Sequence, residues 1–162
     1  MALVDYFLKI DGIPGEAPDA KHKGEIEVES FSWGANQMGT ALTGGGLGAG
    51  KAQMQDFSFV MRINKASPKL LLACTSGEHI KSAILVCRKA GKEQQEYLKI
   101  TFSDLIVTSY STTGTGGGEV IPMDQVSLNY TKIEMEYREQ KPDGSLAGPI
   151  KAWYDLKEQK SG

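Results

Sequence analysis

This chain of 162 residues has little of the material from which metal centres, membrane spans and nucleic-acid interfaces are made. Two cysteines and two histidines leave few ligands for a transition metal. No apolar run approaches the ~20 residues that a membrane-spanning helix needs. The 18 Lys and Arg residues nearly balance the 20 Asp and Glu residues, and they form no basic block. Because phosphate binding depends on clustered positive charge, nucleic acid is not expected as a principal partner.

The few cysteines and histidines do not form a recognisable reactive site. Cys74 and Cys87 stand among apolar residues, so we expect two small buried side chains and no disulfide. His22 lies in a polar stretch and is expected to be solvated. His79 follows a helical segment and is expected to make a structural hydrogen bond. The motifs of serine hydrolases and zinc proteases are absent, so we expect no enzyme, no metal and no cofactor.

The length and the N-terminus bound the organisation of the chain. A chain of 162 residues is expected to form one domain, residues 1–162, with a single core. The segment from Met1 to Tyr6 has neither a basic start nor a long apolar stretch, so no signal peptide is expected. The protein is therefore expected to fold in the cytoplasm.

A glycine-rich run resembles a nucleotide-binding loop without its essential neighbours. Gly45–Lys51 has the P-loop spacing, but Ala52 cannot supply the hydroxyl that holds magnesium, and alternating residues indicate that a strand follows. A P-loop instead opens a helix whose N-terminus binds phosphate. A second glycine cluster, Gly114–Gly118, is also followed by no helical pattern. We expect two loops between strands and no nucleotide role for Lys51.

Alternation of apolar and polar residues, typical of strands, runs through most of the chain. Four times the apolar face changes parity by one residue, at Phe31, Phe57, Leu105 and Ile133, and none of these slips carries glycine or proline. A β-bulge or sharp bend produces such a slip, whereas the alternative is two short strands with an unrecognised turn. We expect long, bent antiparallel strands that form a two-sheet β-barrel.

One segment carries the signals of a helix. Ser67 suits its N-cap, Pro68 its first helical position and Gly77 its left-handed C-terminus. The residues between them, Leu70–Cys74, are apolar nearly all round, so we expect the helix to pack against the barrel. The predicted fold is therefore mainly β, with one short flanking α-helix and an extended glycine-rich loop.

Residues 83–87 read Ala-Ile-Leu-Val-Cys and are apolar on both faces of a strand. In an antiparallel protein, such a strand is covered on both sides. The core would cover one side, and the helix or another subunit would cover the other. Ala83, Leu85 and Cys87 are therefore candidate subunit-interface residues.

Several segments, in the same order along nearly the whole chain, carry a resemblance to a known family. They are Phe31-Ser32-Trp33-Gly34 before the glycine-rich loop, Gln55-Asp56-Phe57-Ser58-Phe59, Ser67–Cys74 with Gly77 and His79, Arg88-Lys89-Ala90-Gly91, Gln95–Leu98, Val126–Tyr130 and the turn Gln140–Gly144. In these segments the chain resembles the haemolysin-coregulated protein (Hcp) family. The departures fall in loops, chiefly Gly12–Gly24 and the tail after Gly148.

The resemblance implies that the chain is the inner-tube protein of the bacterial type VI secretion system. Family members form homohexameric rings that stack into a hollow tube. A contractile sheath fires this tube, tipped by the valine-glycine-repeat spike protein, into a target cell. The lumen can carry small effector proteins, and export needs no signal peptide. A free-standing β-barrel that binds a ligand or peptide is the alternative, with the glycine loop as its lid.

Two further predictions concern sites in the assembly. The loop of residues 38–50 is too long for a simple hairpin connection, so we expect it to dock on the neighbouring ring. Its ring-stacking residues would be Thr43, Gly44, Gly45, Gly46, Leu47, Gly48 and Ala49. Ser32 lies between Phe31 and Trp33, which should face the core, so Ser32 should face outward and is a candidate for the lumen wall.

Overall fold

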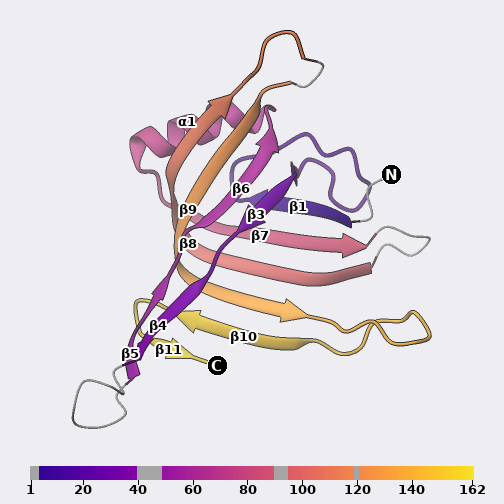
Figure 1. Ribbon diagram of the computed structural model, residues 1–162, viewed down its shortest axis with the longest axis vertical. Coiled ribbons are helices and arrows are strands. Elements are labelled where there is room, and N and C mark those ends of the chain that lie inside the picture. The colour runs from indigo at the N-terminus through magenta and orange to yellow at the C-terminus, as the bar shows by residue number, and fades with distance from the viewer. Residues whose placement is uncertain (1–3, 40–48, 90–94, 119–120) are drawn as a thin grey trace.

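The computed structural model describes residues 4–39, 49–89, 95–118 and 121–162, and it consists of antiparallel strands with one helix (Figure 1). The elements in chain order are β1 (Val4–Ile10), β2 (Ile26–Val28), β3 (Ser30–Ser32), β4 (Ala35–Gly39), β5 (Ala49–Met54), β6 (Phe57–Arg62), α1 (Ala66–Ser76), β7 (Ile80–Lys89), β8 (Gln95–Thr113), β9 (Met123–Tyr137), β10 (Ile150–Asp155) and β11 (Lys160–Ser161).

Two long strands, β8 and β9, pair with each other along almost their whole length and run through both halves of the molecule. The first half of β8 pairs with β7, and the second half of β9 pairs with β10. These halves, with β1, β2 and β11, form what we call the lower sheet. The second half of β8 and the first half of β9 continue into β6 and β3, which we call the upper sheet. Figure 1 shows the two sheets bending apart around the core.

Two of the four predicted bends occur inside continuous strands. In β8 the change of face falls at Asp104, a non-glycine residue with a φ of 47°. Between Val107 and Ser109, β8 also gains one residue against β9. In β9 the buried series moves from Tyr130 to Ile133. These bends carry both strands from the lower sheet into the upper one, which confirms the prediction of a β-barrel of bent strands.

The other two slips are not bends within a strand, so the expectation of continuous strands was wrong there. The chain leaves β2, which pairs with β1, and begins β3, which pairs with β6, after the single residue Glu29. Likewise Gln55 and Asp56 separate β5 from β6. At both places the chain changes its pairing partner. Such a change moves the buried side chains from even to odd positions, which is also the effect of a bulge.

The core between the two sheets is aromatic at its centre. Phe57 and Phe102 are fully buried with ring centroids 4.6 Å apart, and Tyr130 lies 4.8 Å from Phe102. The Tyr130 hydroxyl donates a 2.8 Å hydrogen bond to the Gln55 carbonyl, so its polar end is satisfied. Because these rings come from β6, β8 and β9, the core holds the two sheets together where the long strands bend.

The helix begins differently from the prediction and ends as predicted. Its N-cap is Lys65, and the Asn64 side chain accepts a 2.8 Å hydrogen bond from the Ala66 N–H. The assignment of Ser67 as N-cap was wrong: its buried hydroxyl donates to the Asp124 carboxylate at 2.5 Å. Gly77 closes the helix with a φ of 66°, as expected.

The helix packs against β8 with one side and exposes the other. Leu70 and Ala73 are fully buried, whereas Leu71 and Leu72 are 50% and 64% exposed. The helix therefore packs against the barrel as expected, but its apolar sequence does not keep its other side out of solvent. Cys74 is half-buried, and Cys87 is buried with its pKa raised to about 12 by burial, so Cys87 is the small apolar side chain that was predicted.

Both faces of β7 are largely buried within the chain itself. Ala83, Leu85 and Cys87 are at most 1% exposed and belong to the chain's own core. The opposite face carries Val86, which is paired with Phe7 of β1. The ring of His22, from the segment between β1 and β2, stacks on Phe7 at 4.5 Å. The assignment of the three core residues to a subunit interface stays a prediction, and the structure offers a neighbour no exposed side chain at these positions.

Candidate functional site

The outer face of the upper sheet is polar and uncovered within the described part of the chain. Ser32 is exposed there, while Phe31 and Trp33 pack against the core, as the alternation predicted. Ser32 stands opposite Ser58 of β6, Ser58 opposite Ser127 of β9, and Ser127 opposite Ser109 of β8. The hydroxyls of Ser58 and Ser127 are 2.8 Å apart. Four serines thus form one row across four strands, which we call the serine row.

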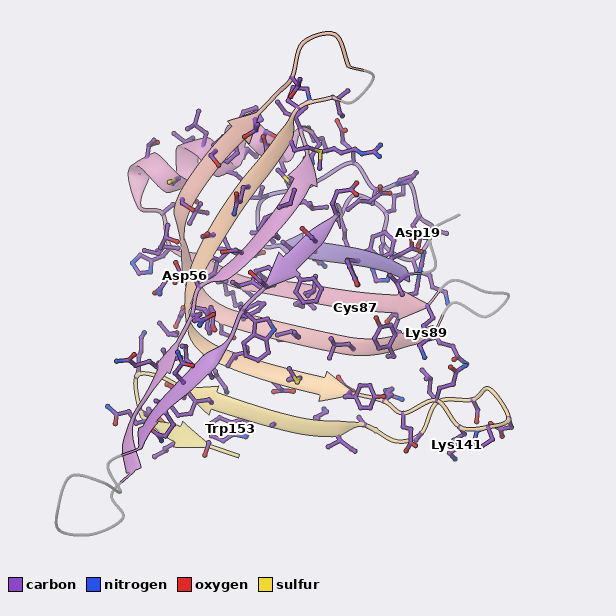
Figure 2. The ribbon with its side chains drawn as sticks, viewed as in Figure 1. Asp19, Asp56, Cys87, Lys89, Lys141 and Trp153 are labelled. Carbon is purple, nitrogen blue, oxygen red and sulfur yellow. The ribbon has the colours of Figure 1, made fainter. Side chains whose placement is uncertain are left out.

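A second polar group extends this face. The Asp56 carboxylate accepts hydrogen bonds from the Thr108 hydroxyl at 2.8 Å and from the Asn129 amide at 2.9 Å. Figure 2 shows Asp56 beside the bend of the long strands. Together with the serine row, these side chains make a wall of short polar groups. These side chains are short, and together they can both donate and accept hydrogen bonds.

The upper sheet has two open edges. Within the described residues, β3 pairs with β6 on one side and with no strand on the other. The Ile106–Thr113 part of β8 pairs with β9, while the partner on its far side, β7, ends its pairing at Leu105. An unpaired strand edge presents a row of backbone donors and acceptors to another chain. The serine row therefore lies between two edges that can each accept a strand.

A two-stranded arm, formed by β4 and β5, projects from the body of the molecule (Figure 1). It contains the strand after the glycine-rich run, so Lys51 lies in β5 and not at the start of a helix. Of the predicted stacking residues, Thr43, Gly44, Gly45, Gly46, Leu47 and Gly48 lie outside the described residues, and Ala49 begins β5.

The base of the arm borders an apolar hollow of about 290 Å³. Trp33, Ala35 and Met54 line it from the arm's side, and residues of β9 and β10 line it from the other, among them Trp153, labelled in Figure 2. A hollow of this size and lining could take an apolar side chain or a small ligand.

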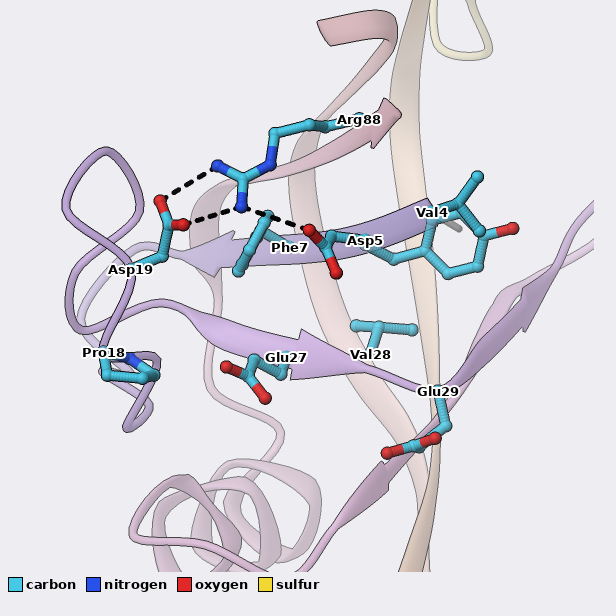
Figure 3. A pocket seen from close by; sticks show the side chains of 10 residues that line it. Val4, Asp5, Phe7, Pro18, Asp19, Glu27, Val28, Glu29 and Arg88 are labelled. Atoms are coloured by element: carbon cyan, nitrogen blue, oxygen red, sulfur yellow. Dashed lines mark hydrogen bonds and ion pairs between the residues drawn. The ribbon is translucent and has the colours of Figure 1, made fainter. Parts of the chain in front are cut away.

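The outer face of the lower sheet is covered by the segment between β1 and β2, residues 11–25, which we call the cover loop. Arg88 of β7 donates to both carboxylate oxygens of Asp19, at 3.0 and 2.6 Å, and to Asp5 at 3.2 Å (Figure 3). These hydrogen bonds hold the pKa of Asp19 well below its usual range. The Arg88 guanidinium also lies 4.7 Å from the centre of the Phe7 ring. A hollow of about 630 Å³ opens beside this ion pair.

His22 belongs to the same cover and contradicts the prediction that it is solvated. It is 6% exposed, with Nδ1 2.9 Å from Glu25 and Nε2 2.7 Å from Glu96. A polar stretch of sequence suggested a loop in water, but its residues fold back onto Phe7 and bury the ring. His79, by contrast, is exposed after the helix.

The sequence identified one member of the serine row and missed three. Ser58 alternates with the buried Phe57 and Phe59, and Ser127 alternates with the buried Val126 and Leu128. The same parity that placed Ser32 could therefore have placed these two. Ser109 was out of reach, because the extra residue before it in β8 resets the alternation.

Comparisons with known proteins agree with this architecture. A family model described as "Type VI secretion system effector, Hcp" matches residues 7–137. Protein hcp1 of Pseudomonas aeruginosa is 43% identical over 157 residues, which are 96% of each chain. The crystal structure of Hcp1 from Salmonella typhimurium is similar with a TM-score of 0.82 at 40% identity, covering 99% of this chain and 100% of that one. A type VI secretion system effector from Yersinia pestis has a TM-score of 0.76 at 38% identity, covering 93% and 99%.

The fold and these relatives define a component of the type VI secretion machine. The chain belongs to the Hcp family, and it is a tube subunit of that system, as the resemblance of its sequence implied. Within the described residues, the structure contains no helix long and apolar enough to cross a membrane.

Proposed function

We propose that six copies of this chain close a ring in which the β3 edge of each upper sheet pairs with the β8 edge of the next. The serine row then lines the lumen, and stacked rings form the tube. The observation that carries this proposal is the polar sheet face bounded by two open edges. The chain, residues 1–162, acts as one domain in this assembly.

Two different edges suit a ring better than a symmetric dimer. When one surface binds a different surface of an identical neighbour, the contact repeats, and it closes into a ring if the rotation allows. Main-chain hydrogen bonds between the edges would supply affinity at each junction, as in other cases of strand addition. The upper sheet of each copy would then continue into the next around the ring.

The composition of the face suits a lumen that carries cargo. Ser32, Ser58 and Ser127 are short and hydroxylated, so they occupy little of the channel and can donate or accept hydrogen bonds with any polar surface. Small effector proteins are the proposed cargo. The other proposed partners are the valine-glycine-repeat spike protein at the tip and the contractile sheath around the tube.

The tube is proposed to leave the cell through this machine and without a signal peptide. Its work is mechanical, with no catalysis, nucleotide or nucleic acid.

The apolar hollow beside Trp33 and Met54 is the observation that favours the second candidate, a free-standing module that binds a ligand or peptide. Native mass separates the two candidates, because the module would be a monomer.

Proline at adjacent positions of β8 tests the ring junction. Successive backbone N–H groups of a strand point to opposite edges. Proline has no N–H, so one of the variants Ser111→Pro and Thr112→Pro removes a hydrogen-bond donor to β9, and the other removes a donor at the open edge of β8. We expect the open-edge variant to be a folded monomer by circular dichroism and native mass, where the parent is a ring of six. A parent that is monomeric at micromolar concentration, or two variants that both form rings, would contradict the proposal.

Ser32→Gln tests the lumen. The longer side chain should leave the ring's mass unchanged and reduce the amount of a co-expressed small effector that copurifies with it. The matched control is Ser145→Gln, in the exposed turn Gln140–Gly148 and away from the serine row. If both variants retain the effector equally well, Ser32 does not line a cargo channel.

Replacing Thr43–Ala49 with a short Gly-Ser turn tests stacking. The hexamer's mass and melting temperature should be nearly unchanged, because the arm lies outside the body of the protomer. Tube formation at high protein concentration and secretion through the machine should be lost, since six weak contacts act together to hold each ring on the next. Normal stacking, or a hexamer that falls apart, would refute a stacking role.

A further inference from the structure

Part of the core-facing side of the lower sheet is apolar and has no cover from the described residues. In β9, Ile133 is buried in the core, and Met135 and Tyr137 lie on the same face because they are two and four residues further along the strand. Tyr137 is 45% exposed, and the residue opposite it in β10, Ile150, is 70% exposed. The apolar hollow beside Trp33 continues this surface toward the arm. We call Tyr137, Ile150 and the lining of the hollow the open face.

A second apolar surface lies on α1. Leu71 and Leu72 are the exposed leucines of the helix side that faces away from the core. Figure 1 shows α1 near the upper end of the molecule and β10 near the lower end, so the helix of a protomer does not reach its own open face. Exposed apolar side chains gathered in this way mark surfaces that contact other chains.

The two apolar surfaces lie beside the two open edges of the upper sheet. Trp33 directly follows β3, so the hollow begins at one edge. At the other edge, the Asp124 carboxylate accepts hydrogen bonds from Ser67 of α1 at 2.5 Å and from Tyr110 of β8 at 3.0 Å, which holds the helix beside the open edge of β8. Trp33 packs against the core and the helix buries Leu70 in it, so both surfaces adjoin the core side of the sheet and not the serine row.

We propose that the open face of each copy is covered by α1 of the next copy in the ring, with Leu71 and Leu72 packed against Ile150 and the rest of that face. The inference rests on the ring proposed above and adds a second contact to each junction. When the β3 edge of one copy meets the β8 edge of the next, the helix of the next copy comes to the core side of the sheet beside Trp33. The helix and the open face are different surfaces, so their contact repeats around the ring as the strand edges do.

The two contacts of a junction have different roles. Main-chain hydrogen bonds between strands replace hydrogen bonds to water, so each adds little net free energy. Burying leucine side chains removes apolar surface from water and stabilises the junction in proportion to the area. The helix contact therefore supplies most of the affinity, and the paired strand edges set the register of one copy on the next.

Chemical cross-linking tests the contact directly. Leu72→Cys and Ile150→Cys are introduced in a Cys74→Ala background, where Cys87 is 1% exposed and does not react. A short, flexible bis-maleimide should link the double variant into a ladder of covalent species that ends at six. Co-assembled single variants should give dimers only, and each single variant alone should give none, because the contact joins two different surfaces.

Native mass separates a failure of this inference from a failure of the proposed ring. A double variant that forms a ring of six but no ladder would overturn the helix contact and leave the strand junction standing. The open face would then belong to the glycine-rich loop or to a small ligand. A monomeric parent would overturn the ring and the helix contact together.

Serine on the helix tests the energy of the contact. Leu71→Ser combined with Leu72→Ser should keep the circular dichroism of the protomer, because both side chains are exposed in it. The dissociation constant of the junction, from native mass over a dilution series, should rise at least about a hundredfold. The matched control is Ile63→Ser with Ile121→Ser, which are 40% and 50% exposed and lie in neither surface. A helix variant that dissociates no more than this control would refute the contact.

Discussion

β8 and β9 contribute to the outer faces of both the upper and the lower sheet, yet the two faces differ. The upper one is mainly polar and exposed, whereas the lower one is covered by a loop. On the upper sheet, the outward positions are mainly serine, threonine, asparagine and aspartate, with the half-buried Val60 and Ile106 among them, and the described chain leaves the polar side chains exposed or half-exposed. On the lower sheet, the outward positions include Phe7 and Val86, which are both buried, and the ring of His22 from the cover loop stacks on Phe7. The two faces of this tube subunit therefore differ in both polarity and cover.

The difference shows that the residues of a sheet face indicate whether the face is exposed or covered within the protomer. Short polar residues need no cover, so a bare face of such residues can remain a surface in the assembly. An apolar outward position must be buried, and here the chain uses its own loop, tied by Arg88 and His22, instead of a second subunit. The buried ion pair of Arg88 and Asp19 lies on the covered face, where it holds the loop on the sheet.

The largest effect should come from removing the cation that ties the cover loop. Arg88→Ala should lower the free energy of unfolding by about 3 kcal/mol in chemical denaturation, because it leaves the carboxylates of Asp5 and Asp19 without their buried partner. Arg88→Met combined with Asp19→Asn should recover part of that loss. An Arg88→Ala protein as stable as its parent would mean that the loop is held by other contacts.

A smaller loss should follow from crowding the cover loop's backbone. A Cβ on Gly15 would lie 2.5 Å from the Glu25 carbonyl oxygen, where the backbone itself would have to move. Gly15→Ala should therefore cost about 2 kcal/mol in free energy of unfolding and speed exchange of the Ala17 amide. Gly116→Ala, with nothing within 4 Å of its new Cβ, is the control and should change little.

The covered face should also respond to acid. The pKa of Asp19 is lowered from 3.8 by its hydrogen bonds with Arg88, so its ionised form stabilises the folded state above that value. This contribution is lost progressively as pH falls below about 4. Denaturation at a series of pH values should show a shallower acid dependence for Asp19→Asn than for the parent. Identical slopes would show that Asp19 does not couple loop closure to acid.

The smallest effect is expected on the bare face. Ser127→Ala removes a 2.8 Å contact with Ser58, but water can replace it at a half-exposed position. The free energy of unfolding should change by no more than about 0.5 kcal/mol, and the ring's mass should be unchanged. A loss comparable to that of Arg88→Ala would erase the distinction between the two faces.

The fold was largely predictable because the alternation of apolar and polar residues along a strand can be read from neighbouring positions in the sequence. Alternation predicted β1, the bends of β8 and β9 and the outward Ser32, and the local signals of Pro68 and Gly77 predicted the helix. It could not tell a bend from a change of partner at Phe31 and Phe57, since both flip the face by one residue. That distinction depends on which strands lie alongside, which is set by contacts distant in the sequence.

The covered face escaped prediction for a related reason. The partners of His22 and Arg88 are Glu96 and Asp19, which lie 74 and 69 residues away along the chain. No spacing rule links them, and a polar loop with glycines and prolines is ordinarily solvated. The serine row was found in part, because one residue of it follows from alternation while its alignment across four strands depends on register.

The passage of β8 and β9 through both sheets has a mechanical consequence. A push on the upper sheet reaches the lower sheet through covalent backbone, because β8 and β9 run through both sheets and pair with each other along most of their length. For one sheet to slide over the other, the backbone of both long strands would have to change at their bends, at Asp104 in β8 and between Tyr130 and Ile133 in β9. The protomer should therefore transmit a sudden load as a single stiff body and yield first at its junctions with other copies.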